Sequence, residues 1–290
     1  MTTVGAVFVP QLPPERLRGV ARAADEAGLA ELWLWEDCFR ESGVASAAAA
    51  LAWTDRLHIG VGLLPVPLRN VAVAAMETAT LHRLFPGRIT VGIGHGVQDW
   101  MGQVGARVES PMTLLREYAT ALSALLGGES VTTAGRYVHL DGVRLDWPPA
   151  VPPALVVGAG GPRSLQLSGE LADATLITCG TTPDALRQAR RHIDAGRLAA
   201  GRSGPHALIV NVLAATGERA AERFDAERRA WGFDPAQDVG VAGDAATVAD
   251  AVRRWAEAGA DTVVLQPTAD EPDPEGFVRF VAAEVQPLVR

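Results

Sequence analysis

Short apolar runs alternate with segments of helical periodicity along the whole chain. Eight runs rich in Val, Leu and Ile are typical of strands covered on both faces, and they lie at residues 4–9, 31–35, 57–63, 88–93, 155–157, 174–178, 207–213 and 262–266. Apolar residues at helical spacing predict helices between and after them, at residues 13–27, 42–53, 70–85, 110–127, 162–171, 183–200, 218–231, 247–258 and 276–288. Eight strand–helix units predict a single closed (β/α)8 barrel, a TIM barrel of α/β class, as one domain over residues 1–290.

One stretch breaks this rhythm after the fourth strand–helix unit. Residues 136–145 alternate between apolar and polar positions, with Asp141 and Gly142 in the middle. This pattern predicts an exposed, inserted hairpin. A doubly wound open sheet is the alternative to the barrel.

Composition excludes several classes of chemistry. All 26 basic residues are arginine, so a Schiff-base lysine and a P-loop lysine are both excluded. The net charge of −8 without any basic run argues against a nucleic-acid partner. The sequence has only two cysteines, Cys38 and Cys179, and they lie far apart, so we expect no disulfide scaffold. It also has no closely spaced histidines, so we expect no metal site.

No targeting or membrane segment is expected. Residues 1–10 are apolar but lack a basic start, so they predict a first strand rather than a signal peptide. No apolar run reaches about 18 residues, the length that a membrane helix needs. We therefore expect a cytoplasmic protein with reduced thiols.

The strongest local signal follows the fifth strand. In a barrel the reacting groups lie at the carboxyl ends of the strands. Gly160 and Gly161 precede Pro162, which suits a first helical position, so the amides of Gly161, Arg163 and Ser164 are expected near a helix N-terminus. Such amides favour an anion, and Arg163 adds charge. A plain strand-to-helix turn is the alternative.

The glycines after the fourth strand do not form a dinucleotide fingerprint. Gly92, Gly94 and Gly96 are followed by Val97 where the fingerprint requires glycine, and residues 98–109 are expected to be a loop. Small residues here leave room for a flat ring. His95 is the ionisable group among them, either as a catalytic residue or as a structural loop histidine.

The second strand ends in two adjacent acids. Glu36 and Asp37 point to opposite sides of an extended chain, so we expect one of them to face the barrel mouth. A carboxylate there can exchange a proton with a ligand. Cys38 has no nearby group that would activate it as a nucleophile. Trp100 and Cys179 also follow strand ends and could wall a pocket.

The sequence resembles the bacterial luciferase-like oxidoreductases, and among them the branch that uses the deazaflavin coenzyme F420. The resemblance covers essentially the whole chain. It is carried by the order and spacing of residues 27–37 (AGLAELWLWED), 57–63 (LHIGVGL), 80–88 (TLHRLFPGR), 92–96 (GIGHG) and 158–162 (GAGGP).

The resemblance implies a flavin or deazaflavin at the mouth of a luciferase-like barrel. The phosphate would lie at Gly160, Gly161, Arg163 and Ser164. A cis peptide in a bulge at Gly62–Leu63 would support the back of the ring. Asp37 would hydrogen-bond the ring, and His95 and Gly96 would line it. Cys38, Trp100 and Cys179 are then expected in the substrate pocket, and the protein is expected to form a homodimer.

Two positions depart from deazaflavin dehydrogenases. Cys38 stands where a histidine is common, and Val97 stands where one branch has a glutamate acid or base. A sugar-phosphate dehydrogenase is therefore not favoured, and His95 and Asp37 are the candidate catalytic residues. The expected reaction is hydride transfer between F420 and a small organic substrate. An FMN-dependent monooxygenase and a non-catalytic flavin-binding barrel are the alternatives.

Overall fold

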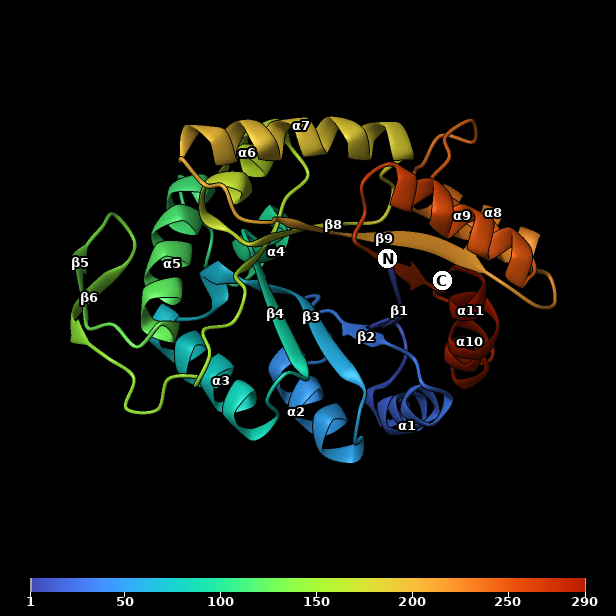
Figure 1. Cartoon of the computed structure of the whole chain (residues 1–290), viewed down its shortest axis with the longest axis horizontal. Helices are drawn as coiled ribbons and strands as arrows, with labels where there is room; N and C mark the ends of the chain where they lie inside the picture. Colours follow the sequence, from blue (N-terminus) through green and yellow to red (C-terminus); the bar gives the residue numbers. More distant parts are fainter. Residues whose placement is uncertain (1, 290) are drawn as a thin grey trace.

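Eight parallel strands pair side by side and close into a barrel (Figure 1). They are β1 (Thr3–Phe8), β2 (Glu31–Leu34), β3 (His58–Pro65), β4 (Ile89–Gly94), β7 (Val156–Gly158), β8 (Ala174–Ile177), β9 (Ala207–Ala215) and β11 (Thr262–Gln266). In this computed structural model, which describes residues 2–289, β11 pairs with β1 and β8 pairs with β9. These pairings leave the barrel no open edge. The predicted (β/α)8 barrel is confirmed, and the alternative of an open sheet is wrong.

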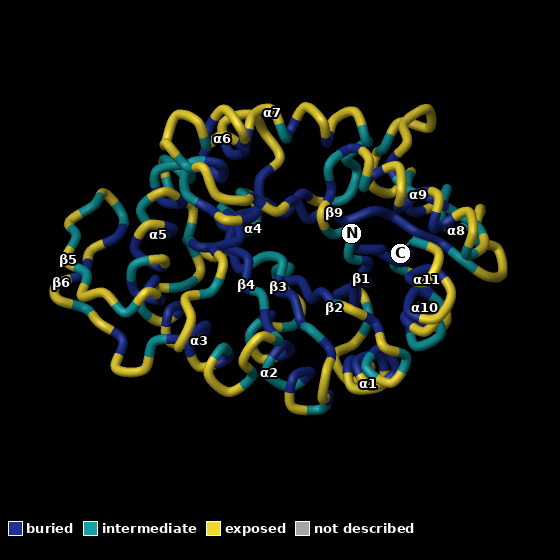
Figure 2. Tube along the Cα trace, in the orientation of Figure 1, coloured by how far each residue is buried: buried dark blue, intermediate teal, exposed yellow. Residues whose placement is uncertain are grey.

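Helices surround the barrel, with their buried residues facing it and their exposed residues outward (Figure 2). They are α1 (Leu17–Ala27), α2 (Gly43–Trp53), α3 (Val71–Leu84), α5 (Pro111–Leu126), α6 (Pro162–Leu171), α7 (Pro183–Ala199), α8 (Ala220–Ala230), α9 (Ala245–Glu257) and α10 (Pro274–Phe280). The chain continues from α10 through a π-helical turn, η3 (Val281–Val285), into α11 (Gln286–Val289), and two 3-10 turns, η1 (Pro14–Arg16) and η2 (Val66–Leu68), precede α1 and α3. Polar side chains that accept a backbone N–H begin many of these helices, among them Ser42, Asn70, Ser110, Thr182, Asp244 and Asp273.

The barrel interior is filled by large side chains from alternate positions of the strands. Val7, Trp33, Leu176, Ile209 and Val264 are buried in one cluster there. The Trp33 indole occupies the space beside Gly60, where an added Cβ would lie 2.3 Å from the ring. The interior is therefore a packed core, and a ligand can enter only above it, at the carboxyl ends of the strands.

The inserted hairpin is present, but its turn lies elsewhere. Its strands are β5 (Val131–Ala134) and β6 (His139–Val143), so Asp141 and Gly142 lie within a strand and not at the turn. The turn is residues 135–138. Its backbone N–H groups at Arg136, Tyr137 and Val138 donate to the carboxylate of Glu117 on α5. These hydrogen bonds to a residue far away in the sequence determine where the chain reverses, and a local sequence pattern does not reveal them.

A helix replaces the loop that was expected after β4. α4 (Gln98–Gln103) begins directly after Val97 and buries Met101 completely. Gly105, which adopts a positive φ of 71°, lies past its end. Of the two glycines that argued against a helix, Gly102 lies within α4 and Gly105 follows its end. The sequence analysis also missed β10 (Gly240–Ala242), a short strand that pairs with the end of β9.

Two glycines allow α6 and α7 to cross closely. A Cβ added at Gly169 would lie 2.0 Å from the carbonyl oxygen of Ile193, and one at Gly196 would lie 2.0 Å from that of Gln166. These contacts are with backbone atoms, which cannot turn aside as a side chain can. The crossing fixes α6, the helix that follows the glycine turn at the barrel mouth.

We predict that Gly169→Ala destabilises the protein by about 1–3 kcal/mol, the usual cost of overpacking. The sign of this change in the free energy of unfolding is informative, because helix propensity alone would make alanine about 1 kcal/mol more stable than glycine in a helix interior. Urea unfolding measures the difference. Gly204→Ala, where a Cβ meets nothing within 4 Å, is the control and should change little. An unchanged or increased free energy of unfolding in Gly169→Ala would contradict the tight crossing.

Candidate functional site

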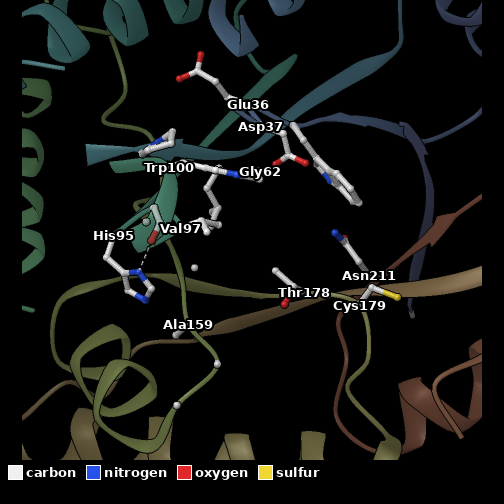
Figure 3. Close-up of a pocket in the computed structure, with 18 of the residues that line it drawn as sticks. Glu36, Asp37, Gly62, His95, Val97, Trp100, Ala159, Thr178, Cys179 and Asn211 are labelled. Carbon is white, nitrogen blue, oxygen red and sulfur yellow. Dashed lines mark hydrogen bonds between the residues drawn. The ribbon is translucent and has the colours of Figure 1, made fainter. Parts of the chain in front are cut away.

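A cavity of about 530 Å³ opens at the carboxyl ends of the barrel strands (Figure 3). Its size is that of an ordinary small-molecule site. Residues from six strand ends and from two flanking helices line it: Trp35, Glu36, Asp37, Gly62, Leu63, Pro65, Gly94, His95, Gly96, Val97, Trp100, Gly158, Ala159, Gly160, Gly161, Thr178, Cys179, Asn211 and Trp231. The fold thus brings most of the expected site residues to one space.

A bulge in β3 forms one wall of this cavity. The pairing of β3 with β4 shifts register between Val61 and Leu64, and the Gly62–Leu63 peptide bond is cis, as the family resemblance implied. The Leu63 side chain lies across three positions that carry no side chain: Gly92, Gly94 and Gly158. A Cβ at Gly158 would lie 2.0 Å from Leu63 Cδ1. These glycines of β4 and β7 therefore make room for an apolar wall.

The two acids at the end of β2 diverge, as expected. Glu36 points away from the middle of the cavity (Figure 3), forms a bidentate ion pair with Arg69 and accepts the N–H of Gly43. Asp37 points into the cavity. Burial raises the pKa of Asp37, although the nearby Arg40 opposes this shift. Asp37 is thus the carboxyl group that can hold a proton beside a ligand.

The glycine turn between β7 and α6 is open. A Cβ at Gly160 would meet nothing within 4 Å, and one at Gly161 would meet only the Ser164 hydroxyl at 3.9 Å. Ser164 is buried, accepts the N–H of Gly161 and donates to its carbonyl, so it braces the turn and does not line the cavity. The helix leaves its first amides unpaired. Arg163 is exposed beside them and is also outside the lining.

His95, Gly96 and Trp100 lie on the β4 side of the cavity. His95 Nδ1 is 2.9 Å from the Gly96 carbonyl, which can only accept, so this nitrogen carries the hydrogen. In the neutral tautomer with this hydrogen, Nε2 is an acceptor. Gln98 braces the same loop by donating to the carbonyls of His95 and Gly96. Val97 and Trp100 also line the cavity.

The opposite side is formed by Thr178, Cys179, Asn211 and Trp231. Burial raises the pKa of the Cys179 thiol to about 12, so it is no nucleophile at neutral pH. Trp231 is held in place by its indole N–H, which donates to the buried Glu227, and by the Phe233 ring at 5.8 Å. Sequence reasoning missed Asn211 and Trp231. For Asn211 a signal existed, because it is the polar residue within an otherwise apolar strand.

Cys38 does not line the cavity, although it was expected in the substrate pocket. Asp37 and Arg40 close a tight turn through a 2.8 Å backbone hydrogen bond, and this turn carries Cys38 off the line of β2.

Within residues 2–289 there is no group of three or more His, Cys, Asp or Glu side chains placed to hold a metal ion. Nor does any helix in that range have the length and apolar character to cross a membrane.

The comparison with known protein families agrees with this geometry. The model of the family described as luciferase-like monooxygenase matches residues 2–239, most of the chain. The chain belongs to this family. The family expectation and the expectation of an enzyme are thereby confirmed.

Relatives of this luciferase-like protein include F420-dependent enzymes. A 5,10-methylenetetrahydromethanopterin reductase of Methanolobus tindarius is 31% identical over 201 residues, which cover 69% of this chain and 61% of the reductase. The match thus spans about three fifths of that relative. An F420-dependent glucose-6-phosphate dehydrogenase of Kineococcus radiotolerans is 28% identical over 97% of this chain and 94% of that enzyme.

Solved structures share the fold of this luciferase-like protein. An F420-dependent secondary alcohol dehydrogenase, in complex with an F420–acetone adduct, superposes with a TM-score of 0.88 at 20% identity, covering 100% of this chain and 99% of that one. The FMN complex of the oxygenating constituent of 3,6-diketocamphane monooxygenase from Pseudomonas putida gives 0.80 at 18% identity, with the same coverage. At such identities the likeness shows the barrel and no more.

We predict that Asp37→Asn increases the free energy of unfolding at pH 7 to 8. Burial raises the pKa of the folded-state carboxyl above its unfolded value, so ionisation destabilises the folded protein as pH rises. Below the ordinary value of 3.8 both states are protonated, and the gain disappears. Urea unfolding from pH 3 to pH 8 measures this trend. The exposed Asp141→Asn is the control, and a gain independent of pH would contradict a buried, protonatable Asp37.

Proposed function

We propose that this protein is an F420-dependent oxidoreductase that transfers a hydride between the deazaflavin and an organic substrate in the barrel-mouth cavity. The main observation in support of this proposal is that three features lie in one cavity. An apolar bulge lies at Leu63, a protonatable acid at Asp37, and an open glycine turn at Gly160–Gly161. A flat ring with an anionic tail needs these three surfaces.

The residues present fit such a group. The phosphate would accept hydrogen bonds from the free amides at the start of α6, where the helix dipole also favours negative charge. No side chain fills the space at Gly160, and Arg163 is exposed beside it. The ring would lie against Leu63, with Asp37 within reach of its polar edge. When bound, the deazaflavin supplies the carbon that accepts or gives the hydride.

F420 is favoured over FMN by sequence similarity. The F420-dependent glucose-6-phosphate dehydrogenase described above is 28% identical over 97% of this chain, and among the solved structures the F420-dependent secondary alcohol dehydrogenase is 20% identical, against 18% for the FMN-binding monooxygenase. The chain itself argues against a sugar phosphate as substrate, because no arginine lines the cavity within the described residues and the sequence has no lysine. Val97, which lines the cavity, supplies no acid or base at its position.

Proton handling falls to Asp37 and His95. Asp37 has a raised pKa and therefore holds a proton to a higher pH than an exposed carboxyl. When its ring is neutral, His95 presents Nε2 as an acceptor, because Nδ1 donates to the Gly96 carbonyl. Either group can exchange a proton with a substrate oxygen or nitrogen if the substrate lies between them and Leu63.

The decisive experiment titrates purified protein with F420 and, separately, with FMN, and follows fluorescence. We predict tighter binding of F420 and at least a tenfold loss of its affinity in Gly161→Val, because the new side chain would fill the space at the free amides. Gly161 adopts an extended φ of −92°, so valine is tolerated by the backbone and the variant should fold.

Gly204→Val is the matched control, since it also adds a side chain in open space but lies far from the cavity lining. Tighter binding of FMN, with oxygen consumption when reduced, would favour the luciferase-like monooxygenase. Binding without turnover of any substrate would favour a flavin-binding barrel. Equal F420 affinity in Gly161→Val and wild type would place the tail elsewhere.

We also propose that the protein is a homodimer. α3 exposes three large apolar side chains, Val73, Met76 and Leu84, with Met76 60% exposed. Apolar area of this kind on one helix favours burial against a second molecule. Analytical ultracentrifugation of the wild type and of Met76→Arg tests this, and a wild-type monomer at micromolar concentration would contradict it.

A further inference from the structure

Asn211 is a polar side chain in an apolar strand, and it lies at the cavity. It belongs to β9, between buried Val210 and Val212, and only 2% of its surface is exposed. Its Oδ1 is buried and has no hydrogen-bond partner among the described residues. Its amide nitrogen points toward the cavity and the Asp37 carboxyl (Figure 3). An unpaired buried amide destabilises the folded chain, so packing alone does not explain it.

The neighbours of Asn211 define what can bind there. Thr178 and Cys179 lie beside it at the end of β8, Asp37 lies across from it, and Trp35 also lines the cavity. The glycine turn, where the cofactor tail is placed above, belongs to β7, two strands away in the barrel. Asn211 therefore lies on the side of the cavity away from the phosphate site.

The charges on this side are unsuited to an anion. Asp37 and Glu36 line the cavity, and no arginine does. Arg69 is already paired with Glu36 and Glu77, and Arg40, which lies near Asp37, donates to the carbonyl of Pro10 and is outside the lining. An anionic substrate would therefore enter a partly desolvated cavity whose lining offers it no free cation, which costs free energy.

We propose that Asn211 is the specificity-determining residue that donates a hydrogen bond, through Nδ2, to the oxygen of an uncharged carbonyl or alcohol substrate. This inference rests on the proposed function and adds the substrate class. The oxygen lies between the Asn211 amide and the Asp37 carboxyl, which provide two donors when Asp37 is protonated. Trp35 and Trp231 flank the apolar part of the molecule. Phosphorylated and carboxylated analogues are disfavoured because no arginine belongs to the cavity lining within the described residues, so their charge would lose water without gaining a cation.

The first experiment compares Asn211→Leu with Gln266→Leu. Gln266 on β11 is the matched control because it is equally buried, also has an unpartnered oxygen, and does not line the cavity. We expect both variants to keep or raise the thermal midpoint, since each loses an unsatisfied polar group. A clear fall in the midpoint of Asn211→Leu alone would overturn the proposal by showing a structural role.

The second experiment uses the cofactor-loaded protein and a matched pair of probes, 2-pentanone and 4-oxopentanoate. They share the ketone and differ by a carboxylate. Wild type and Gln266→Leu should bind 2-pentanone at least tenfold more tightly than 4-oxopentanoate, as measured by calorimetry. Asn211→Leu should lose about 10- to 100-fold in affinity for 2-pentanone, the usual effect of a lost hydrogen bond in a desolvated site.

The outcomes separate this inference from the proposed function. F420 affinity should be the same in all three proteins, because Asn211 lies away from the phosphate site. Failure of F420 to bind wild type would defeat the proposed function, whereas a parallel loss of F420 affinity in Asn211→Leu would overturn only the substrate assignment. Preference for 4-oxopentanoate, or unchanged ketone affinity in Asn211→Leu, would also overturn it.

Discussion

The site depends on close approach at positions without side chains. Leu63 covers the packed core only because Gly92, Gly94 and Gly158 leave its side chain room on β4 and β7. A larger residue at any of these positions would push the bulge into the space that a ligand needs, so the shape of the cavity follows from three missing side chains. The same constraint acts outside the barrel, where Gly169 and Gly196 set the position of α6 through backbone contacts.

Charge at the mouth is arranged by the alternation of an extended chain. Glu36 and Asp37 are adjacent, yet the first is neutralised by Arg69 and the second is left beside the cavity without a paired cation. Burial then acts on Asp37 alone and keeps its proton to higher pH. Two residues of the same chemistry thus acquire a structural and a chemical role through the direction in which each side chain points.

Local patterns predicted the parts of the fold that local energetics determines. The eight strands, the asparagine that begins α3 and the place of the inserted hairpin were confirmed. The turn of that hairpin was misplaced because Glu117, about 20 residues earlier, captures three of its amides. α4 was missed because its short length is stabilised by the burial of Met101, which no local pattern shows. In the site, Asp37 and the glycine turn were found from strand ends, whereas Trp231 reaches the cavity from the end of α8 and has no such signal.

Asn211 shows why a sequence rule fails where function is concentrated. A strand covered on both faces should be apolar throughout, and β9 follows this rule at its other buried positions. The single exception lies where the barrel interior meets the cavity, so its amide has core packing on one side and a ligand space on the other. The buried Oδ1 has no partner among the described residues and lowers stability, whereas Nδ2 faces the cavity and is available to a ligand. A locally unfavourable residue is therefore tolerated where one of its polar atoms serves a ligand, which makes such residues useful markers of specificity.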